Sequence, residues 1–236
     1  MSYDERDTPP MAALMALVVP VFNEAGVIGS VIDEIRRTGD YLVIVVDDGS
    51  SDDTWQQARQ KNVLALRHRL NRGKGAAIKT GILAANLLGA DIIVTMDGDG
   101  QHDPADIELL VEPIRAGHCD VVLGSRLLDR HEMPRIKVIA NWAGNFFTWV
   151  LYGTWVSDSQ SGFRAYSRHA ALIIDTRADK YEYDSKVIRE IKNNRLRFGE
   201  VQIHTRYTEY SMGKKHKQGF INGLVTLFRM IWKMIA

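Results

Sequence analysis

One stretch of the chain decides its fold: Ile92-Ile93-Val94-Thr95-Met96-Asp97-Gly98-Asp99-Gly100-Gln101-His102-Asp103-Pro104. Its apolar, β-branched beginning predicts a buried strand, and Gly98 and Gly100 permit a sharp turn where that strand ends. Asp97 and Asp99 then place two hard oxygen donors close together, which suits Mg²⁺ or Mn²⁺, and Gln101 assists the ion directly or through water. The alternative is a solvated turn, because Asp and Gly are ordinary turn residues.

Strand-like and helix-like patterns alternate on both sides of this stretch. Besides the run before Asp97, apolar runs predict strands at 16–21, 41–46, 63–66 and 120–123. Helical spacing and capping residues predict helices at 27–35, from Ser51 or Asp52, at 76–88, and from Pro104 or Ala105. This order predicts an α/β fold whose mostly parallel central sheet carries helices on both faces.

The composition changes after Leu128. Residues 138–152 are apolar and aromatic at helical spacing, which predicts core packing, with a membrane surface as the alternative. A loop at 157–162, a strand at 163–166, a helix at 184–193 and a strand at 200–205 follow. We therefore expect a disordered tip at 1–12, one domain at 13–210 and a basic amphipathic segment at 211–236.

Length and charge exclude several classes of protein. The 236 residues suffice for one large domain with an appendage. The 30 basic and 29 acidic residues nearly balance, which argues against nucleic acid as the main partner. Cys119 is the only cysteine, so no intrachain disulfide forms and a reducing cytosol fits. Because no apolar run reaches about 20 residues, a conventional membrane span is not expected.

Three familiar binding motifs can also be rejected from the sequence. The segment 73–80 resembles a P-loop only faintly, since Ile78 stands where the second glycine is required. Neither glycine pair, at 73–75 or at 98–100, extends to the third glycine of a dinucleotide-binding turn. One cysteine and seven scattered histidines offer no zinc-ligand spacing.

Polar clusters follow three of the predicted strands, at Asn23-Glu24, Asp47-Asp48 and Asp97-Gly98-Asp99. Ligands of such sheets bind beyond the carboxyl ends of the strands, so the clusters predict a shared nucleotide pocket. Asp47 and Asp48 would accept hydrogen bonds from the base and ribose, or would only end their strand.

The remaining nucleotide contacts are predicted on either side of those aspartates. Pro20, Asn23 and Glu24 would line the other side of the nucleoside, with a helix-start charge as the alternative for Glu24. Asp97 and Lys74 would lie near phosphate, although a solvated loop lysine is an equal alternative for Lys74.

Six motifs together carry a family resemblance. They are Val19-Pro20-Val21-Phe22-Asn23-Glu24, Val46-Asp47-Asp48-Gly49-Ser50, Asn71-Arg72-Gly73-Lys74-Gly75, Asp97-Gly98-Asp99-Gly100-Gln101-His102-Asp103-Pro104, Gly124-Ser125-Arg126 and Asp158-Ser159-Gln160-Ser161-Gly162-Phe163-Arg164. In this order the chain resembles the family 2 glycosyltransferases, most of all the branch of dolichyl-phosphate mannose synthase and bacterial polyprenyl-phosphate sugar transferases. The resemblance runs from about Leu17 to about Tyr207. It implies a GT-A fold, a UDP- or GDP-linked sugar donor, a divalent cation and inversion at the anomeric carbon.

The residues suggest how such a transfer would proceed. Negative charge builds on the leaving diphosphate, and a cation held by Asp97 and Asp99 would stabilise it. Arg126 and Arg164 are suited to donor or acceptor phosphate, with surface ion pairs as the alternative. Asp158 would be the general base for a hydroxyl acceptor. A lipid phosphate is already anionic, so Asp158 would then orient the acceptor or Arg164.

The C-terminal segment bears on the acceptor. Lys214 and Lys215 precede a helical apolar pattern at 220–235, which predicts a helix in the membrane interface with its basic residues near lipid phosphate. Packing against the catalytic domain or a second subunit is the alternative, so a homo-oligomer is possible. Ser211-Met212-Gly213-Lys214 departs from the Arg-x-x-Gly-x-Ser-Lys segment common in that branch.

The sequence therefore predicts an inverting glycosyltransferase of cell-envelope glycan synthesis, which moves a sugar to a polyprenyl phosphate at the cytoplasmic face of a membrane. A saccharide or protein hydroxyl as acceptor and a non-catalytic nucleotide-sugar-binding scaffold are the alternatives. Retention of both motif carboxylates, Arg126, Asp158 and Arg164 argues against the scaffold.

Overall fold

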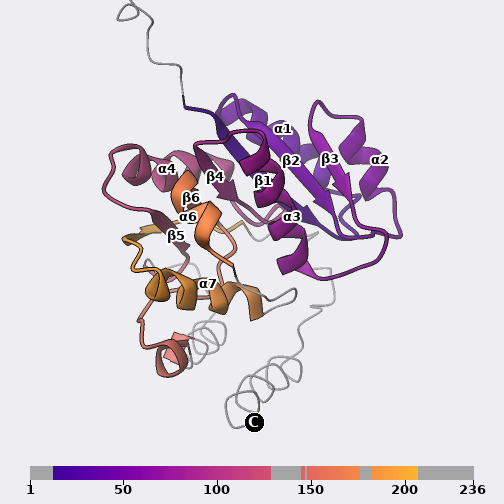
Figure 1. Ribbon diagram of the computed structural model, residues 1–236. Coiled ribbons are helices and arrows are strands. Elements are labelled where there is room, and N and C mark those ends of the chain that lie inside the picture. The colour runs from indigo at the N-terminus through magenta and orange to yellow at the C-terminus, as the bar shows by residue number, and fades with distance from the viewer. Residues whose placement is uncertain (1–12, 129–144, 147, 176–181, 207–236) are drawn as a thin grey trace, which may run out of the picture.

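The computed structural model describes residues 13–128, 145–146, 148–175 and 182–206. Within them, a sheet of seven strands has the order β3-β2-β1-β4-β6-β5-β7 (Figure 1). The strands are β1 (Met15–Val21), β2 (Leu42–Asp47), β3 (Leu64–Arg67), β4 (Ile92–Thr95), β5 (Val121–Ser125), β6 (Arg164–Ser167) and β7 (Phe198–Gln202). The helical elements are α1 (Ile28–Thr38), α2 (Thr54–Arg59), α3 (Lys74–Leu87), the 3-10 turn η2 (Pro104–Asp106), α4 (Ile107–Arg115), α6 (Arg168–Ile173) and α7 (Glu182–Asn193).

The sheet is mostly parallel, as the alternation of elements predicted. Strands β3, β2, β1 and β4 pair in parallel, and so do β5 and β7. Only β6 is reversed, because it pairs antiparallel with both β4 and β5. The predicted α/β architecture is thus confirmed.

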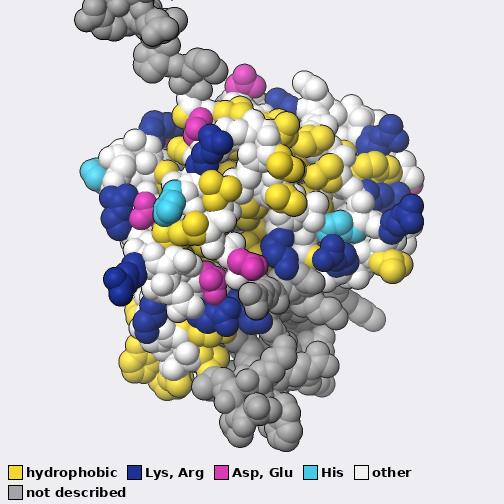
Figure 2. Space-filling view, viewed as in Figure 1, with side chains coloured by type: hydrophobic (Ala, Val, Ile, Leu, Met, Phe, Trp, Pro, Cys, Tyr) yellow, Lys and Arg dark blue, Asp and Glu magenta, His cyan; other side chains and the backbone are white. Residues whose placement is uncertain are grey.

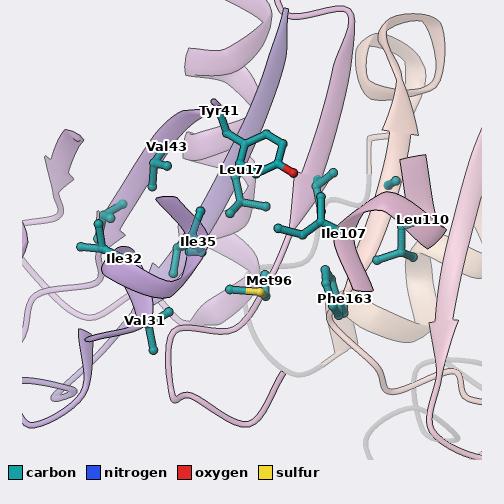
Figure 3. Close-up of a cluster of buried hydrophobic side chains, with 14 of the residues drawn as sticks. Leu17, Val31, Ile32, Ile35, Tyr41, Val43, Met96, Ile107, Leu110 and Phe163 are labelled. Atoms are coloured by element: carbon teal, nitrogen blue, oxygen red, sulfur yellow. The ribbon is translucent and has the colours of Figure 1, made fainter. Parts of the chain in front are cut away.

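Helices cover both faces of this sheet, and the alternation along β1 shows which face meets which helices. Leu17 and Val19 belong to one buried cluster with the apolar sides of α1 and α4, which Figure 3 shows in close-up. Ala16 and Val18 belong to a second cluster with α3, α6 and α7. Successive strand residues point to opposite faces, so a strand that is apolar at every position must be covered on both.

The topology brings the predicted site segments to one edge of the sheet. Val21 pairs with Asp47, so the ends of β1 and β2 lie together. Thr95 and Leu123 both pair with Arg164, so β4 and β5 end beside the start of β6. The loops that follow four strands and the loop that precedes the reversed one therefore meet at this edge.

Several element boundaries differ from the prediction, and α6 was not predicted. Strand β7 begins and ends earlier than expected because its pairing with β5 runs from Phe198 to Gln202. Helix α6 is only six residues long and is started by the Ser167 side chain, which accepts a hydrogen bond from the Ala170 amide (3.2 Å). So short a helix gives no clear periodic pattern.

The core prediction for residues 138–152 is wrong for two aromatic side chains of that stretch, those of Phe146 and Trp149. Phe146 and Trp149 are 37% and 45% exposed, and Figure 2 shows hydrophobic side chains gathered on the surface at this end of the molecule. The buried positions of the same turn are Asn145 and Thr148, which bond to the loop at 157–159. The side of this turn that faces the protein is therefore polar, and Phe146 and Trp149 lie on the side that faces solvent.

The predicted tip at 1–12 and the segment at 211–236 lie outside the described residues. In the described part of the chain, no helix has the length and apolar character needed to cross a membrane.

Close packing of α3 on β1 gives a stability prediction. A Cβ at Gly81 would lie 2.2 Å from Val18 Cγ1, so Gly81→Ala should push the helix off the sheet and lower the free energy of unfolding by about 1–3 kcal/mol. Gly29→Ala, in α1, is the control, because its nearest neighbour would be Lys61 Cε at 3.7 Å. It should leave stability unchanged or raise it by up to about 1 kcal/mol. Chemical denaturation measures the free energy of unfolding of both variants. If Gly81→Ala is as stable as wild type, the packing argument is contradicted.

Candidate functional site

The site is centred on the loop after β4, which two glycines shape. A Cβ at Gly98 would lie 2.4 Å from Val21 Cγ1, so this residue lets the loop pack on the end of β1. Gly100 has a φ of 76°, a conformation that favours glycine. The loop is closed by Asp99, whose Oδ1 accepts a hydrogen bond from the Gln101 amide (3.0 Å).

This loop brings two carboxyl groups, those of Asp97 and Asp99, close together. Burial raises the pKa of Asp99, and the nearby Asp97 carboxylate raises it further. Burial also acts to raise the pKa of Asp97, but the Lys74 ammonium and His102 outweigh it and hold that pKa well below its ordinary value. Two carboxylates that repel one another in a partly buried loop are stabilised by a cation between or beside them.

The donor set fits a divalent ion that is shared with a bound ligand. Asp97 and Asp99 offer the hard oxygen atoms that Mg²⁺ and Mn²⁺ prefer, and Gln101 follows them in the loop. Over the described ranges, no group of three or more His, Cys, Asp or Glu residues is arranged to hold a metal by itself. A metal at this loop would therefore take further oxygen ligands from phosphate or water.

Lys74, the first residue of α3, lies directly against Asp97 and close to Asp184. Its Nζ atom is 2.9 Å and 3.0 Å from the two oxygens of Asp97 and 3.5 Å from Asp184 Oδ2. Burial lowers the pKa of Lys74, but the two carboxylates reverse the effect and raise the pKa above its ordinary value. The alternative of a solvated loop lysine is wrong.

Arg164 lies beneath the site rather than at its surface. The residue is 1% exposed, and its guanidinium donates to the carbonyl oxygens of Ser161 (2.8 Å) and Ser159 (2.9 Å). It also lies 3.6 Å from Asp184 Oδ1. This geometry supports the loop before β6 and corrects the predicted contact of Arg164 with phosphate.

Asp184 is the site residue that the sequence analysis missed. It was read only as the start of a helix, yet it bridges Lys74 and Arg164. A signal was present, because Asp184 shares the helical spacing of Val187 and Ile188, which are buried against the sheet. An acidic residue in register with an apolar face points inward and needs a partner there.

Arg126 and Asp158 form a bidentate pair on the other side of the edge. Arg126 Nε and Nη2 donate to Asp158 Oδ2 (2.7 Å) and Oδ1 (2.9 Å), and the Arg126 amide also donates to Oδ2 (3.2 Å). The Asp158 side chain is fully buried. Asp158 therefore orients Arg126, where the prediction had named the acceptor or Arg164 as the group oriented.

Hydrogen bonds from β7 and from β4 hold the loop at 157–162. Glu200 Oε1 accepts from the amide and the hydroxyl of Ser157, both at 2.7 Å. Thr95 Oγ1 donates to the carbonyl of Gly162 (2.8 Å). A Cβ at Gly162 would lie 2.5 Å from Lys74 Nζ and 2.8 Å from Asp97 Oδ1, so the loop covers the lysine-aspartate pair closely.

On the nucleotide side, Asp48 is fully engaged inside the protein. Its carboxylate accepts from the amides of Arg72 (3.0 Å) and Gly73 (2.6 Å) and lies 2.7 Å from His68 Nδ1. These contacts fix the residues that lead into Lys74. They favour the alternative in which Asp48 shapes the protein over the predicted contact with a nucleotide.

The other predicted nucleotide residues surround the end of β1. Asp47 is buried, with Oδ1 accepting from the Ser50 amide (2.9 Å) and Oδ2 lying 3.0 Å from Arg67 Nε. Asn23, at a φ of 56°, accepts from the Ser51 amide (2.9 Å). The Glu24 carbonyl accepts from two amides that begin α1, and Pro20 lies in β1 paired with Val46. All four border the same edge.

Further hydrogen bonds fix the far end of the loop after β4. The buried carboxylate of Asp106 accepts from the His204 amide (2.6 Å) and lies 2.8 Å from His204 Nδ1. Beside it, the Arg206 amide donates to the Gln101 carbonyl (2.7 Å), and its guanidinium lies 2.8 Å from Asp103. The predicted acceptor residues Lys214 and Lys215 lie outside the described residues.

The fold has a close counterpart among solved structures. Glucosyl-3-phosphoglycerate synthase from Mycobacterium tuberculosis, in a crystal structure with Mn²⁺, uridine diphosphate and phosphoglyceric acid, matches with a TM-score of 0.66. The match covers 91% of this chain and 78% of that one at 22% sequence identity, so it shows the fold alone. It is the GT-A fold that the sequence predicted.

Sequence comparison gives the family. The model described as glycosyl transferase family 2 matches residues 16–172. The UDP-N-acetylglucosamine--dolichyl-phosphate N-acetylglucosaminyltransferase of Methanococcus voltae is 39% identical, over 85% of this chain and 89% of its own length. The undecaprenyl-phosphate mannosyltransferase of Micrococcus luteus is 28% identical over 93% of each chain. The chain belongs to glycosyl transferase family 2.

Proposed function

We propose that this glycosyltransferase moves a sugar from a nucleoside diphosphate to a polyprenyl phosphate, with inversion at the anomeric carbon, and that a divalent cation assists the departure of the diphosphate. The relatives from Methanococcus voltae and Micrococcus luteus are named for lipid-phosphate acceptors. Their sugars differ, so the comparison supports the acceptor class more strongly than the sugar.

The observation that carries the acceptor class is the pairing of Asp158. Both of its oxygens accept from Arg126, and its side chain is buried, so neither oxygen is placed to remove a proton from a hydroxyl group. A phosphate acceptor is already anionic and requires positioning and charge compensation instead. An arginine held rigidly by a buried carboxylate supplies both.

The donor side rests on the edge formed by β1, β2 and β4. Asp97 and Asp99 would hold the cation, which when bound would neutralise the charge that develops on the leaving diphosphate. Asn23, Asp47 and the loop fixed by Asp48 would form the wall of the nucleoside site. Arg126 would hold the attacking phosphate, and Arg164 and Glu200 would keep the intervening loop in place.

Removal of one motif carboxylate tests the donor side. Asp99→Asn should lower transfer to polyprenyl phosphate in vesicles by about 100-fold or more, because a charge that the transition state needs is lost. Asp91→Asn, at the opposite end of β4, is the control and should retain activity.

Thermal shifts of the protein with UDP or GDP and Mn²⁺ would identify the base of the donor nucleotide. Equal inertness of wild type and Asp99→Asn over UDP- and GDP-sugars would support the non-catalytic scaffold instead.

The bidentate pair tests the acceptor side. Arg126→Ala should raise the KM for polyprenyl phosphate roughly 10- to 100-fold while donor affinity is retained. Asp158→Asn should have a similar effect, and the double variant should be no worse than either single one, since both act through one contact. Arg197→Ala, which breaks a comparable exposed pair with Asp120 at the other end of β5, is the control.

A general-base role for Asp158 makes a different prediction. Asp158→Asn would then abolish turnover with a free saccharide or peptide hydroxyl acceptor, while Arg126→Ala would remain active. That outcome would replace the lipid phosphate by a hydroxyl acceptor.

We also propose that the protein works peripherally at the cytoplasmic face of a membrane, through the basic amphipathic segment 211–236. The proposal rests on the sequence pattern and on the lipid acceptors named for the relatives. Deletion from Phe220 onward should reduce flotation with anionic liposomes while nucleotide binding is retained. Equal flotation of the truncated and full chains would refute this role, and a change in the number of subunits on truncation would indicate a subunit contact.

A further inference from the structure

Lys74 pairs with both oxygens of Asp97, one of the carboxylates that the proposed function assigns to the cation. Its ammonium lies at nearly equal distances, 2.9 Å and 3.0 Å, from both oxygens of the carboxylate. The side chains are only 25% and 27% exposed, so solvent screens the pair less than it would on an open surface. The carboxylate that the proposed function assigns to a divalent cation is therefore already paired with a cation of the protein.

The charges around Lys74 explain why it rests there. The carboxylates of Asp97 and Asp184 both lie within 3.5 Å of its ammonium, and the Asp99 carboxyl group is close enough to Asp97 that the Asp97 carboxylate raises its pKa. Arg164 is the other cation beside Asp184, but it is committed to the loop carbonyls below. Without Lys74, His102 would remain beside Asp97 and Arg164 beside Asp184.

We infer that Lys74 is an exchangeable counter-cation: it neutralises Asp97 while the metal site is empty of cation, is displaced when the divalent ion binds, and then pairs with the donor diphosphate. This inference rests on the proposed function, because it assumes a metal and a diphosphate at this edge. It adds that Lys74 opposes binding of the metal alone and favours binding of metal and nucleotide together.

The surroundings allow such an exchange. Lys74 is the first residue of α3, and its backbone is fixed by the Asp48 contacts to Arg72 and Gly73, so only its flexible side chain needs to move. Asp184 Oδ2 lies 3.5 Å from the ammonium, so a second carboxylate stays within reach of Lys74 when the lysine leaves Asp97. Gly162 closes over the pair without a side chain, and any Cβ there would meet the ammonium.

The test measures binding rather than turnover. Mn²⁺ affinity is determined by electron paramagnetic resonance on the full chain, without nucleotide and with saturating UDP or GDP, for wild type and Lys74→Met. The variant should bind Mn²⁺ alone about tenfold more tightly, because a like charge has been removed from its ligand. With Mn²⁺ present, the variant should bind the nucleoside diphosphate about tenfold more weakly, because a charge-assisted contact is lost. The mutual enhancement of the two ligands therefore falls.

Lys61→Met is the matched control. Lys61 also pairs with an aspartate, Asp33, at 2.6 Å, and its side chain is 31% exposed, but the pair joins α1 to the region after α2. This variant should change neither affinity. Lys74→Arg keeps the positive charge and should bind Mn²⁺ alone no more tightly than wild type does, which separates charge from loss of packing.

Two results would overturn the inference. If Lys74→Met binds Mn²⁺ alone as weakly as wild type or more weakly, Lys74 does not compete with the metal. If nucleotide binding is unchanged, the lysine does not move to the diphosphate. Failure of the proposed function would look different, because the Mn²⁺ and nucleotide effects would persist while no sugar reached a polyprenyl phosphate.

Discussion

The constraint on which the site depends is repulsion between carboxylates that the sheet brings to one edge. Asp97 and Asp99 leave the end of β4 two residues apart, and Asp184 approaches from α7 on the other side of Lys74. Buried charges of one sign are tolerated only with compensation, so the cations around them are part of the fold as much as of the chemistry. Lys74 and Arg164 supply that compensation from two unrelated segments of the chain.

The same constraint explains why the two predicted arginines have different roles. Arg164 is enclosed at the start of β6, where its Nε and Nη2 atoms donate to the carbonyls of its own loop. Arg126 follows β5, where its side chain is partly exposed and held in one orientation by Asp158. Only the second arrangement presents a positive charge toward the edge where ligands bind in sheets of this kind.

Much of the fold followed from the sequence because its signals are local. The apolar runs at 16–21 and 41–46 predicted β1 and β2 almost to the residue, and the run before Asp97 predicted β4, which ends at Thr95. The reversal of β6 was not predictable, since a four-residue strand reads the same in either direction. Which partners Asp48 and Arg164 would take was also hidden, because Gly73 lies 25 residues from Asp48 and Asp184 comes from a separate helix.

The reversed strand has a consequence for how such a chain can diversify. The residues proposed to bind the nucleotide and the cation come from one continuous segment, from Pro20 to Gln101, whereas Arg126, Asp158 and the loop before β6 come later. The two parts are joined by the pairing of β4 with β6 and by the bond from Thr95 to Gly162. A chimaera that exchanges the later part at this seam would be expected to inherit its nucleotide preference from one parent and its acceptor from the other.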